Sequence, residues 1–133
     1  MDELFKVPKD MERARSLLKT ATIRYEEIEK IRENVCTERL IETYYDVLKE
    51  QIIALMYIDG NKTLSHIELL NYFKTKYPEL IDDSEFHVLD SLRRRRNDIS
   101  YYGKEISSSF LIQNEDTIKK MIERNFKFIR KLI

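Results

Sequence analysis

The sequence of 133 residues has few of the residues that interrupt helices or cross-link chains. Only two glycines and two prolines occur, and tryptophan is absent. Sandwiches and barrels of β-strands need more turn residues than this, so the composition predicts an all-α fold. Cys36 is the one cysteine, which excludes a disulfide framework within the chain. It also predicts a reducing, cytoplasmic location.

A long apolar segment and an excess of charge of one sign are also missing. The longest apolar run, residues 52–58, is too short to span a bilayer, and the N-terminal segment lacks the apolar core of a secretory signal. We therefore expect no membrane association. The 24 Lys and Arg residues balance the 24 Asp and Glu residues, so any affinity for nucleic acid must come from a local patch. The length suits one domain covering residues 1–133.

Apolar residues recur at spacings of three and four, which predicts four long helices and one short one. The expected N-caps are Asp10, Thr37, Ser65, Ser84 and Asn114. The helices are expected to end near residue 31, at Gly60, before Pro78, at Gly103 and at the C-terminus. These amphipathic helices predict an up-and-down four-helix bundle with one short extra helix.

Four consecutive arginines lie within the fourth helix, in the stretch LRRRRNDISYYG at residues 92–103. At about 100° per residue, Arg96 falls on the apolar stripe, Arg93 at its edge, and Arg94 and Arg95 elsewhere. A guanidinium on an apolar stripe must be satisfied by other groups. A carboxylate on a neighbouring helix, solvent at the rim of the stripe, or a phosphate in a cleft or subunit interface would each do so.

The same stretch resembles the signature helix of HEPN domains, which are small helical bundles that are commonly dimeric. The matching positions are Leu92, Arg93, Arg96, Asn97, Tyr101 and Gly103. The resemblance implies RNA or nucleotide binding and a homodimer through the helix that begins at Ser84 and ends at Gly103. Many members are metal-independent ribonuclease toxins paired with a small nucleotidyltransferase, so a nucleotidyltransferase is a possible partner protein. By position, Arg96 would contact the scissile phosphate and Asn97 would orient the site.

Tyr101 occupies the position where the family pattern has a histidine. A phenol with a pKa of about 10 is a poor base near neutral pH, although it can donate to phosphate or stack on a base. We therefore expect a non-catalytic or degenerate HEPN-like protein that binds phosphate through Arg96, Asn97 and Tyr101, with support from Arg93 and Arg94. One alternative is an active ribonuclease in which Arg96, Asn97 and Tyr101 are catalytic. Another is a purely structural protein–protein interaction bundle.

No other motif in the sequence predicts a competing chemistry. His66 and His87 are expected at the surface or near a helix cap. The chain has no glycine-rich phosphate loop and no Cys or His pair at metal spacing, so we expect neither cofactor nor metal. A helix-turn-helix DNA reader is a minor alternative, because the gap at residues 76–83 is long for such a turn.

Overall fold

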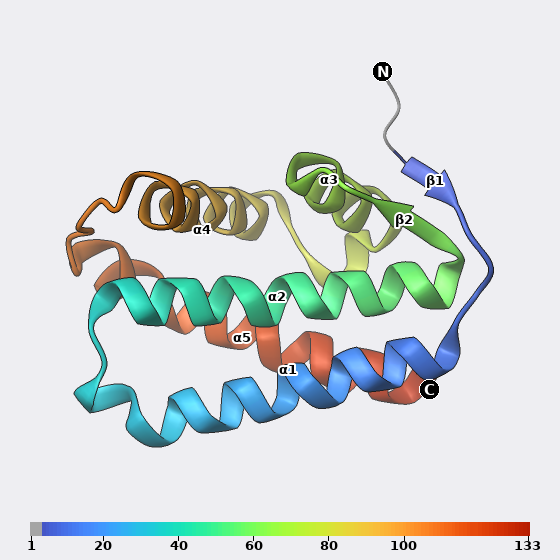
Figure 1. Ribbon diagram of the computed structural model, residues 1–133, viewed down its shortest axis with the longest axis horizontal. Coiled ribbons are helices and arrows are strands. Elements are labelled where there is room, and N and C mark those ends of the chain that lie inside the picture. The colour runs from blue at the N-terminus through green and yellow to red at the C-terminus, as the bar shows by residue number, and fades with distance from the viewer. Residues whose placement is uncertain (1–3) are drawn as a thin grey trace.

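In the computed structural model, residues 4–133 are described, and they form five α-helices and one small antiparallel sheet (Figure 1). The elements in chain order are β1 (Leu4–Lys6), α1 (Met11–Ile31), α2 (Thr37–Asp59), β2 (Asn61–Thr63), α3 (His66–Lys76), α4 (Asp83–Tyr102) and α5 (Ser109–Leu132). Short 3₁₀ turns follow α1 at Arg32–Asn34 and α3 at Pro78–Leu80. The predicted all-α fold is confirmed.

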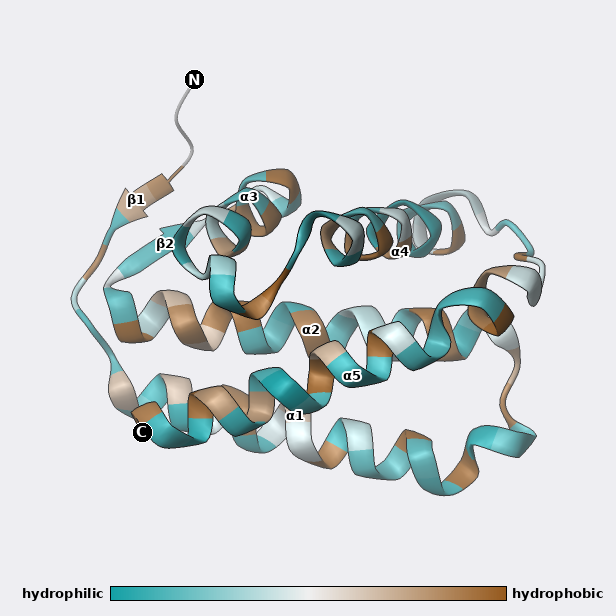
Figure 2. Ribbon diagram, turned by 180° about the vertical axis from the view of Figure 1, so that it is seen from behind, coloured by the Kyte–Doolittle hydropathy of each residue, from teal (hydrophilic) through white to brown (hydrophobic). Residues whose placement is uncertain are grey.

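Helix α2 lies in the middle of the bundle and packs against α1, α4 and α5 (Figure 1). Its apolar residues are fully buried along almost its whole length, among them Ile41, Tyr44, Tyr45, Leu48, Ile52 and Leu55. Each large apolar side chain stabilises the fold by about 1.5–3 kcal/mol relative to an exposed one. Helix α5 alternates hydrophobic and hydrophilic residues along its length, as an amphipathic helix on a core does (Figure 2).

Two of the predicted N-caps and all five of the predicted C-terminal helix ends are confirmed. The side chains of Asp10 and Ser65 each accept a hydrogen bond from the backbone N–H three residues later, at 2.9 and 3.2 Å. Gly60 and Gly103 follow α2 and α4 in the left-handed conformation, with φ of 79° and 61°. Gly60 must be glycine for a second reason, because a Cβ there would lie 2.8 Å from the carbonyl oxygen of Val7.

Two helix starts differ from the predictions by one or two residues. Thr37 is the first residue of α2 rather than its cap, and Cys36 takes the cap position in an extended conformation. Helix α4 is capped by Asp82 rather than Ser84. The Asp82 carboxylate accepts from Glu85 N at 2.7 Å, and the Glu85 carboxylate accepts from Asp82 N at 3.0 Å. This reciprocal pair satisfies two backbone groups, which a serine two residues later would not do.

The predicted N-cap at Asn114 is wrong, because α5 begins at Ser109. Asn114 lies inside the helix, where its Nδ2 donates to the carbonyl oxygen of Phe110 at 2.9 Å. The extra turn of helix buries Phe110 and Leu111 in the core. Burial of two large apolar side chains therefore decides where this helix begins, against the local preference of asparagine for a cap.

The two strands, of three residues each, were not predicted from the sequence. Leu4 pairs with Thr63 and Lys6 with Asn61. Val7 N then donates to Gly60 O at 3.0 Å, which continues the contact to the end of α2. The sheet therefore attaches the segment before α1 to the C-terminal end of α2.

Polar contacts join helices that are distant in the sequence. In the core, Asn125 Nδ2 donates to Gln51 Oε1 at 3.1 Å, and Gln51 Nε2 donates to Ile122 O at 2.9 Å. Both amides are fully buried, so their pairing favours one alignment of α2 with α5.

A second polar contact, at Glu115 of α5, joins this helix to α2 and to the 3₁₀ turn that follows α1. Arg32 Nε donates to Glu115 Oε2 at 2.9 Å, and the Tyr44 hydroxyl donates to the same oxygen at 2.6 Å. Although burial acts to raise the pKa of Glu115, these two donors lower it below the usual 4.5.

None of the helices within residues 4–133 has the length and apolar character needed to cross a membrane.

Candidate phosphate-binding site

The four arginines of α4 lie in four different environments, as the helical angles predict. Leu89 and Leu92 are fully buried and fix which side of α4 faces the bundle. The side chains of Arg93 and Arg96 are 12% and 19% exposed, whereas that of Arg94 is 70% exposed. Arg95 points to the other side of α4, with its guanidinium 4.2 Å from the centre of the Phe110 ring. Arg93 is therefore more buried than Arg96, which the angles place nearer the centre of the apolar stripe.

Asp90 binds two of these arginines on α4 itself. Arg93 donates from Nε and Nη2 to Asp90 Oδ1 at 3.1 and 2.9 Å. Arg94 Nη2 lies 3.0 Å from the other oxygen of the same carboxylate. Because Arg93 and Arg94 share a single negative charge, their combined charge is only half neutralised.

Asp46 on α2 is the carboxylate nearest to Arg96, but the contact is loose. Arg96 Nη2 lies 3.9 Å from Asp46 Oδ1, and Lys49 Nζ lies 3.6 Å from the same oxygen. Oδ1 is buried and accepts no hydrogen bond from the residues that the structure describes. Arg96 and Lys49 thus share one carboxylate without a close hydrogen bond to it, which leaves their N–H groups available to another acceptor.

Together these side chains form what we term the basic cluster. It consists of four cations and two carboxylates: Lys49, Arg93, Arg94, Arg96, Asp46 and Asp90. The excess of two positive charges is local, since the chain as a whole is neutral. Such an excess on a partly buried surface attracts anions.

His66, the first residue of α3, completes the surface beside the basic cluster. Its Nδ1 lies 2.6 Å from the hydroxyl oxygen of Tyr45, and the guanidinium of Arg96 lies 5.7 Å from the centre of the Tyr45 ring. Burial lowers the pKa of His66 below 6.5, and the charges of Lys49, Arg96 and Arg93 lower it further. His66 is therefore neutral at neutral pH and within electrostatic reach of three cations.

The hydrogen bond between Tyr45 and His66 determines which imidazole nitrogen carries the proton. Burial raises the pKa of Tyr45 to about 12, so the phenol keeps its proton. Tyr45 is fully buried, and His66 is the partner of its hydroxyl. Since a buried hydroxyl without an acceptor costs about 1–3 kcal/mol, the hydroxyl donates to Nδ1. His66 then carries its proton on Nε2, which has no hydrogen-bond partner within residues 4–133.

A hollow of about 70 Å³ borders this histidine. Its lining comes from α2, β2, the turn after β2 and α3, namely Lys49, Ile53, Thr63, Leu64, Ser65, His66 and Leu69. The Nε2–H of His66 and the ammonium of Lys49 are both donors at this surface. Donors that lack a close hydrogen-bond acceptor, beside an excess of positive charge, suit the oxygens of a phosphate group.

The other two residues predicted for the site lie further along α4. Asn97 is half-buried, with no side-chain hydrogen bond to another residue within residues 4–133, and Tyr101 is 67% exposed. Within residues 4–133, no side-chain hydrogen bond, ion pair or ring contact joins either of them to the basic cluster. Their predicted roles stay predictions.

The face between α4 and α5 carries two hollows, of about 420 and 310 Å³, that share Arg95 and Phe110. His87 lines the smaller one and is exposed. The larger one is lined by Arg95 and by Arg94, which also belongs to the basic cluster, together with the carboxylates of Asp98 and Glu105. This face therefore lacks the excess of positive charge that distinguishes the basic cluster.

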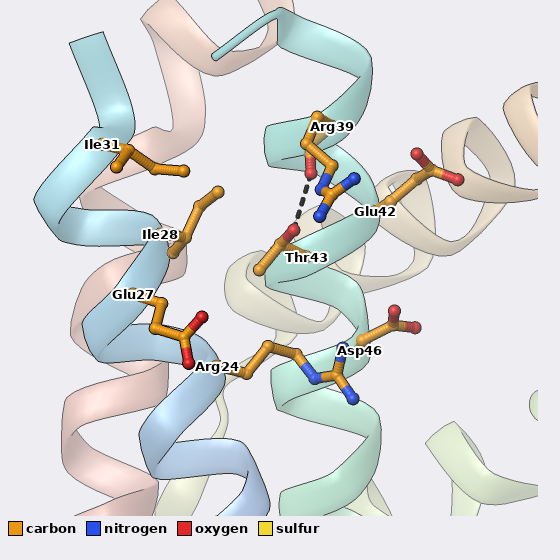
Figure 3. Close-up of a pocket in the computed structure, with 8 residues that line it drawn as sticks. All are labelled: Arg24, Glu27, Ile28, Ile31, Arg39, Glu42, Thr43 and Asp46. Carbon is orange, nitrogen blue, oxygen red and sulfur yellow. Dashed lines mark hydrogen bonds between the residues drawn. The ribbon is translucent and has the colours of Figure 1, made fainter. Parts of the chain in front are cut away.

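A further pocket, of about 290 Å³, lies between α1 and α2 on the other side of Asp46 (Figure 3). We term it the α1–α2 pocket, and its lining residues are Arg24, Glu27, Ile28, Ile31, Arg39, Glu42, Thr43 and Asp46. Arg24 is engaged in an ion pair with Glu50, from Nε to Oε1 at 3.0 Å. Asp46 belongs both to this pocket and to the basic cluster.

Sequence reasoning identified the arginines but not His66, Tyr45 or Lys49 as parts of one surface. His66 was expected near a cap, and it does lie directly after the cap residue Ser65.

No group of three or more possible metal ligands occurs in residues 4–133. No family model, curated protein or solved structure matches the chain.

Proposed function

We propose that this chain is a HEPN-like domain that binds the phosphate groups of RNA without cleaving it. The observation that carries the proposal is the meeting of Lys49, Arg93 and Arg96 with His66 on one surface. Each contributes N–H donors, and two carboxylates leave the four cations of the basic cluster with two excess positive charges. Phosphodiester oxygens are acceptors that carry the matching negative charge.

RNA is favoured over a free anion by the exposed aromatic residue at the end of α4. Tyr101 lies eight residues after Arg93, a rise of about 12 Å along a regular helix. An exposed tyrosine at that distance from bound phosphates can stack on an unpaired base. The resemblance of residues 92–103 to the HEPN signature supports the same ligand. The homodimer through α4 and a nucleotidyltransferase partner belong to the proposal on the strength of that resemblance alone.

The ribonuclease alternative is less favoured because of the tautomer of His66. A histidine beside the basic cluster supplies the residue that position 101 lacks. However, a general base must have an unprotonated nitrogen facing the ribose 2′-hydroxyl, and Nδ1 already accepts from Tyr45. The Nε2–H of a neutral imidazole can donate a hydrogen bond to phosphate, but it is a very weak acid. The geometry thus suits binding better than proton transfer.

Labelled single-stranded RNA tests both parts of the proposal. Purified protein in buffer with a metal chelator should bind the RNA, with an affinity that falls steeply as salt rises. The RNA should stay intact after incubation. Cleavage that disappears in His66→Gln and Arg96→Ala would support the ribonuclease instead, and absence of any salt-dependent binding would contradict the proposal.

A further inference from the structure

The α1–α2 pocket adjoins the basic cluster through a single residue. Asp46 lines the pocket and also lies 3.9 Å from Arg96 and 3.6 Å from Lys49. Asp46 is thus the residue past which a nucleotide whose phosphate meets Arg96 would reach the pocket with its own base or that of its neighbour. In single-stranded RNA, unstacked bases are read in such pockets by stacking and by hydrogen bonds to their edges.

The pocket combines an apolar side with two carboxylates, those of Glu27 and Glu42, and one guanidinium, that of Arg39, none of which forms a hydrogen bond or ion pair within residues 4–133. Ile28 and Ile31 point from α1 toward α2, and the carboxylate of Glu27 lies below them on the same side (Figure 3). Arg39 lines the α2 side, where its carbonyl accepts from Thr43 Oγ1 at 2.8 Å while its guanidinium takes no part in that bond. The side chains of Glu27 and Arg39 are exposed, and neither has a hydrogen-bond or ion-pair partner within residues 4–133, although Glu27 lies close enough to Arg24 to act on it electrostatically.

We infer that this pocket binds a guanine base of the RNA held by the basic cluster. Guanine presents two acceptors, O6 and N7, on one edge and two donors, N1–H and N2–H, on the next. An arginine matches the acceptor edge and a carboxylate matches the donor edge, while the flat ring lies against the isoleucines. The volume of about 290 Å³ leaves room for a purine. The inference rests on the proposed function, since the basic cluster delivers the base to the pocket.

Adenine would be rejected by the same groups. Its N6 amino group replaces the O6 acceptor and would place a donor against the donors of Arg39. Its N1 is an acceptor and would face the carboxylate of Glu27 without a hydrogen between them. Hypoxanthine keeps O6, N7 and N1–H but lacks the N2 amino group, so it should lose only part of the contact with Glu27.

The experiment compares fluorescence anisotropy of three uridine pentanucleotides that carry guanine, hypoxanthine or adenine at the centre. The wild-type protein should bind the guanine oligonucleotide about tenfold or more tightly than the adenine one, with hypoxanthine between them. Glu27→Gln and Arg39→Ala should abolish this preference. The matched controls Glu26→Gln and Arg15→Ala, at exposed positions of α1 outside the pocket, should keep it.

Two further measurements separate this inference from the proposed function. Arg96→Ala should weaken binding of all three oligonucleotides by the same factor and leave the preference unchanged. Guanosine, which has no phosphate, should perturb the amide signals around the pocket in NMR spectra of the wild type and of Arg96→Ala, but not of Glu27→Gln. Equal affinity for the three oligonucleotides, or a guanine preference that survives in Glu27→Gln, would overturn the inference and leave the phosphate site standing. Guanosine binding without salt-dependent RNA binding would contradict the proposed function and uphold the pocket.

Discussion

Replacing Arg96 with alanine should weaken RNA binding much more than it destabilises the fold. The contact of Arg96 with Asp46, at 3.9 Å, is longer than a hydrogen bond, and both side chains are partly exposed. Two unit charges at this distance interact by about 4 kcal/mol at an effective dielectric constant near 20 and by about 1 kcal/mol in water. Lys49 would still neutralise Asp46 in the variant, at 3.6 Å. We therefore expect the free energy of unfolding to fall by only about 1 kcal/mol.

The expected loss in binding is larger. A hydrogen bond from a charged donor contributes about 1.5–3 kcal/mol, which corresponds to a roughly ten- to hundredfold weaker Kd. Removing one contact to a single-stranded phosphate chain should also reduce the slope of log K against log salt by about 0.7. Urea unfolding measures the free energy of unfolding. Anisotropy titrations of labelled RNA at several salt concentrations measure the Kd and the slope of log K against log salt. Arg15→Ala, an exposed arginine on α1 outside the cluster, is the matched control.

One pattern of results would refute this reasoning. If Arg96→Ala lowered the free energy of unfolding by about 3 kcal/mol or more and left RNA affinity unchanged, Arg96 would be one half of a structural ion pair. The purely structural bundle would then be the better interpretation of this chain.

Three other substitutions test the surroundings of the site and the stability of the bundle. Asp46→Asn removes the carboxylate that Lys49 and Arg96 share, so RNA affinity measured by anisotropy should rise severalfold, and an unchanged or lower affinity would speak against the cluster. Because the folded state depresses the pKa of His66 below 6.5, the unfolded chain binds the proton more readily, and the free energy of unfolding should fall as pH is lowered through and below 6.5. In urea titrations, the free energy of unfolding should fall less between pH 7.5 and pH 5.0 for His66→Gln than for the wild type. Equal falls in the two proteins would contradict the depressed pKa of His66. Glu115→Gln leaves the Arg32 guanidinium poorly paired, so the free energy of unfolding measured by chemical denaturation should fall by about 1–3 kcal/mol. An unchanged free energy of unfolding would contradict this prediction.

Local rules account for much of the fold. The caps at Asp10 and Ser65 and the left-handed glycines at Gly60 and Gly103 depend on residues within one turn of each other, so the sequence alone predicts them. The predicted N-cap at Asn114 is wrong because packing with distant residues outweighs a local preference. Phe110 is buried in the core only when the helix begins before it. The two strands could not be predicted, because a segment of three residues is too short to show a periodic pattern. The strands are also far apart in the sequence, since β1 precedes α1 and β2 follows α2.

The candidate site could be predicted only where it lies on one helix. The angular position of Arg96 on α4 indicates that its charge must be satisfied, and Asp46 on α2 does lie near it. The larger burial of Arg93 could not be predicted in this way, because its bond to Asp90 depends on side-chain rotamers rather than on helical angle. Lys49 joins the site through the packing of α2 against α4, which no spacing in the sequence encodes.

The histidine illustrates why a motif carried over by position is incomplete. At position 101 the chain has an exposed tyrosine, and the imidazole beside the arginines comes instead from the start of α3, 35 residues earlier than that position. The presence of an imidazole there does not by itself restore acid–base chemistry. Tyr45, buried beneath it, donates to Nδ1 and leaves an N–H rather than a lone pair at the surface. A buried tyrosine on the central helix thus leaves the imidazole with a donor at this surface, and replacing the tyrosine by phenylalanine would free Nδ1 to take up a proton.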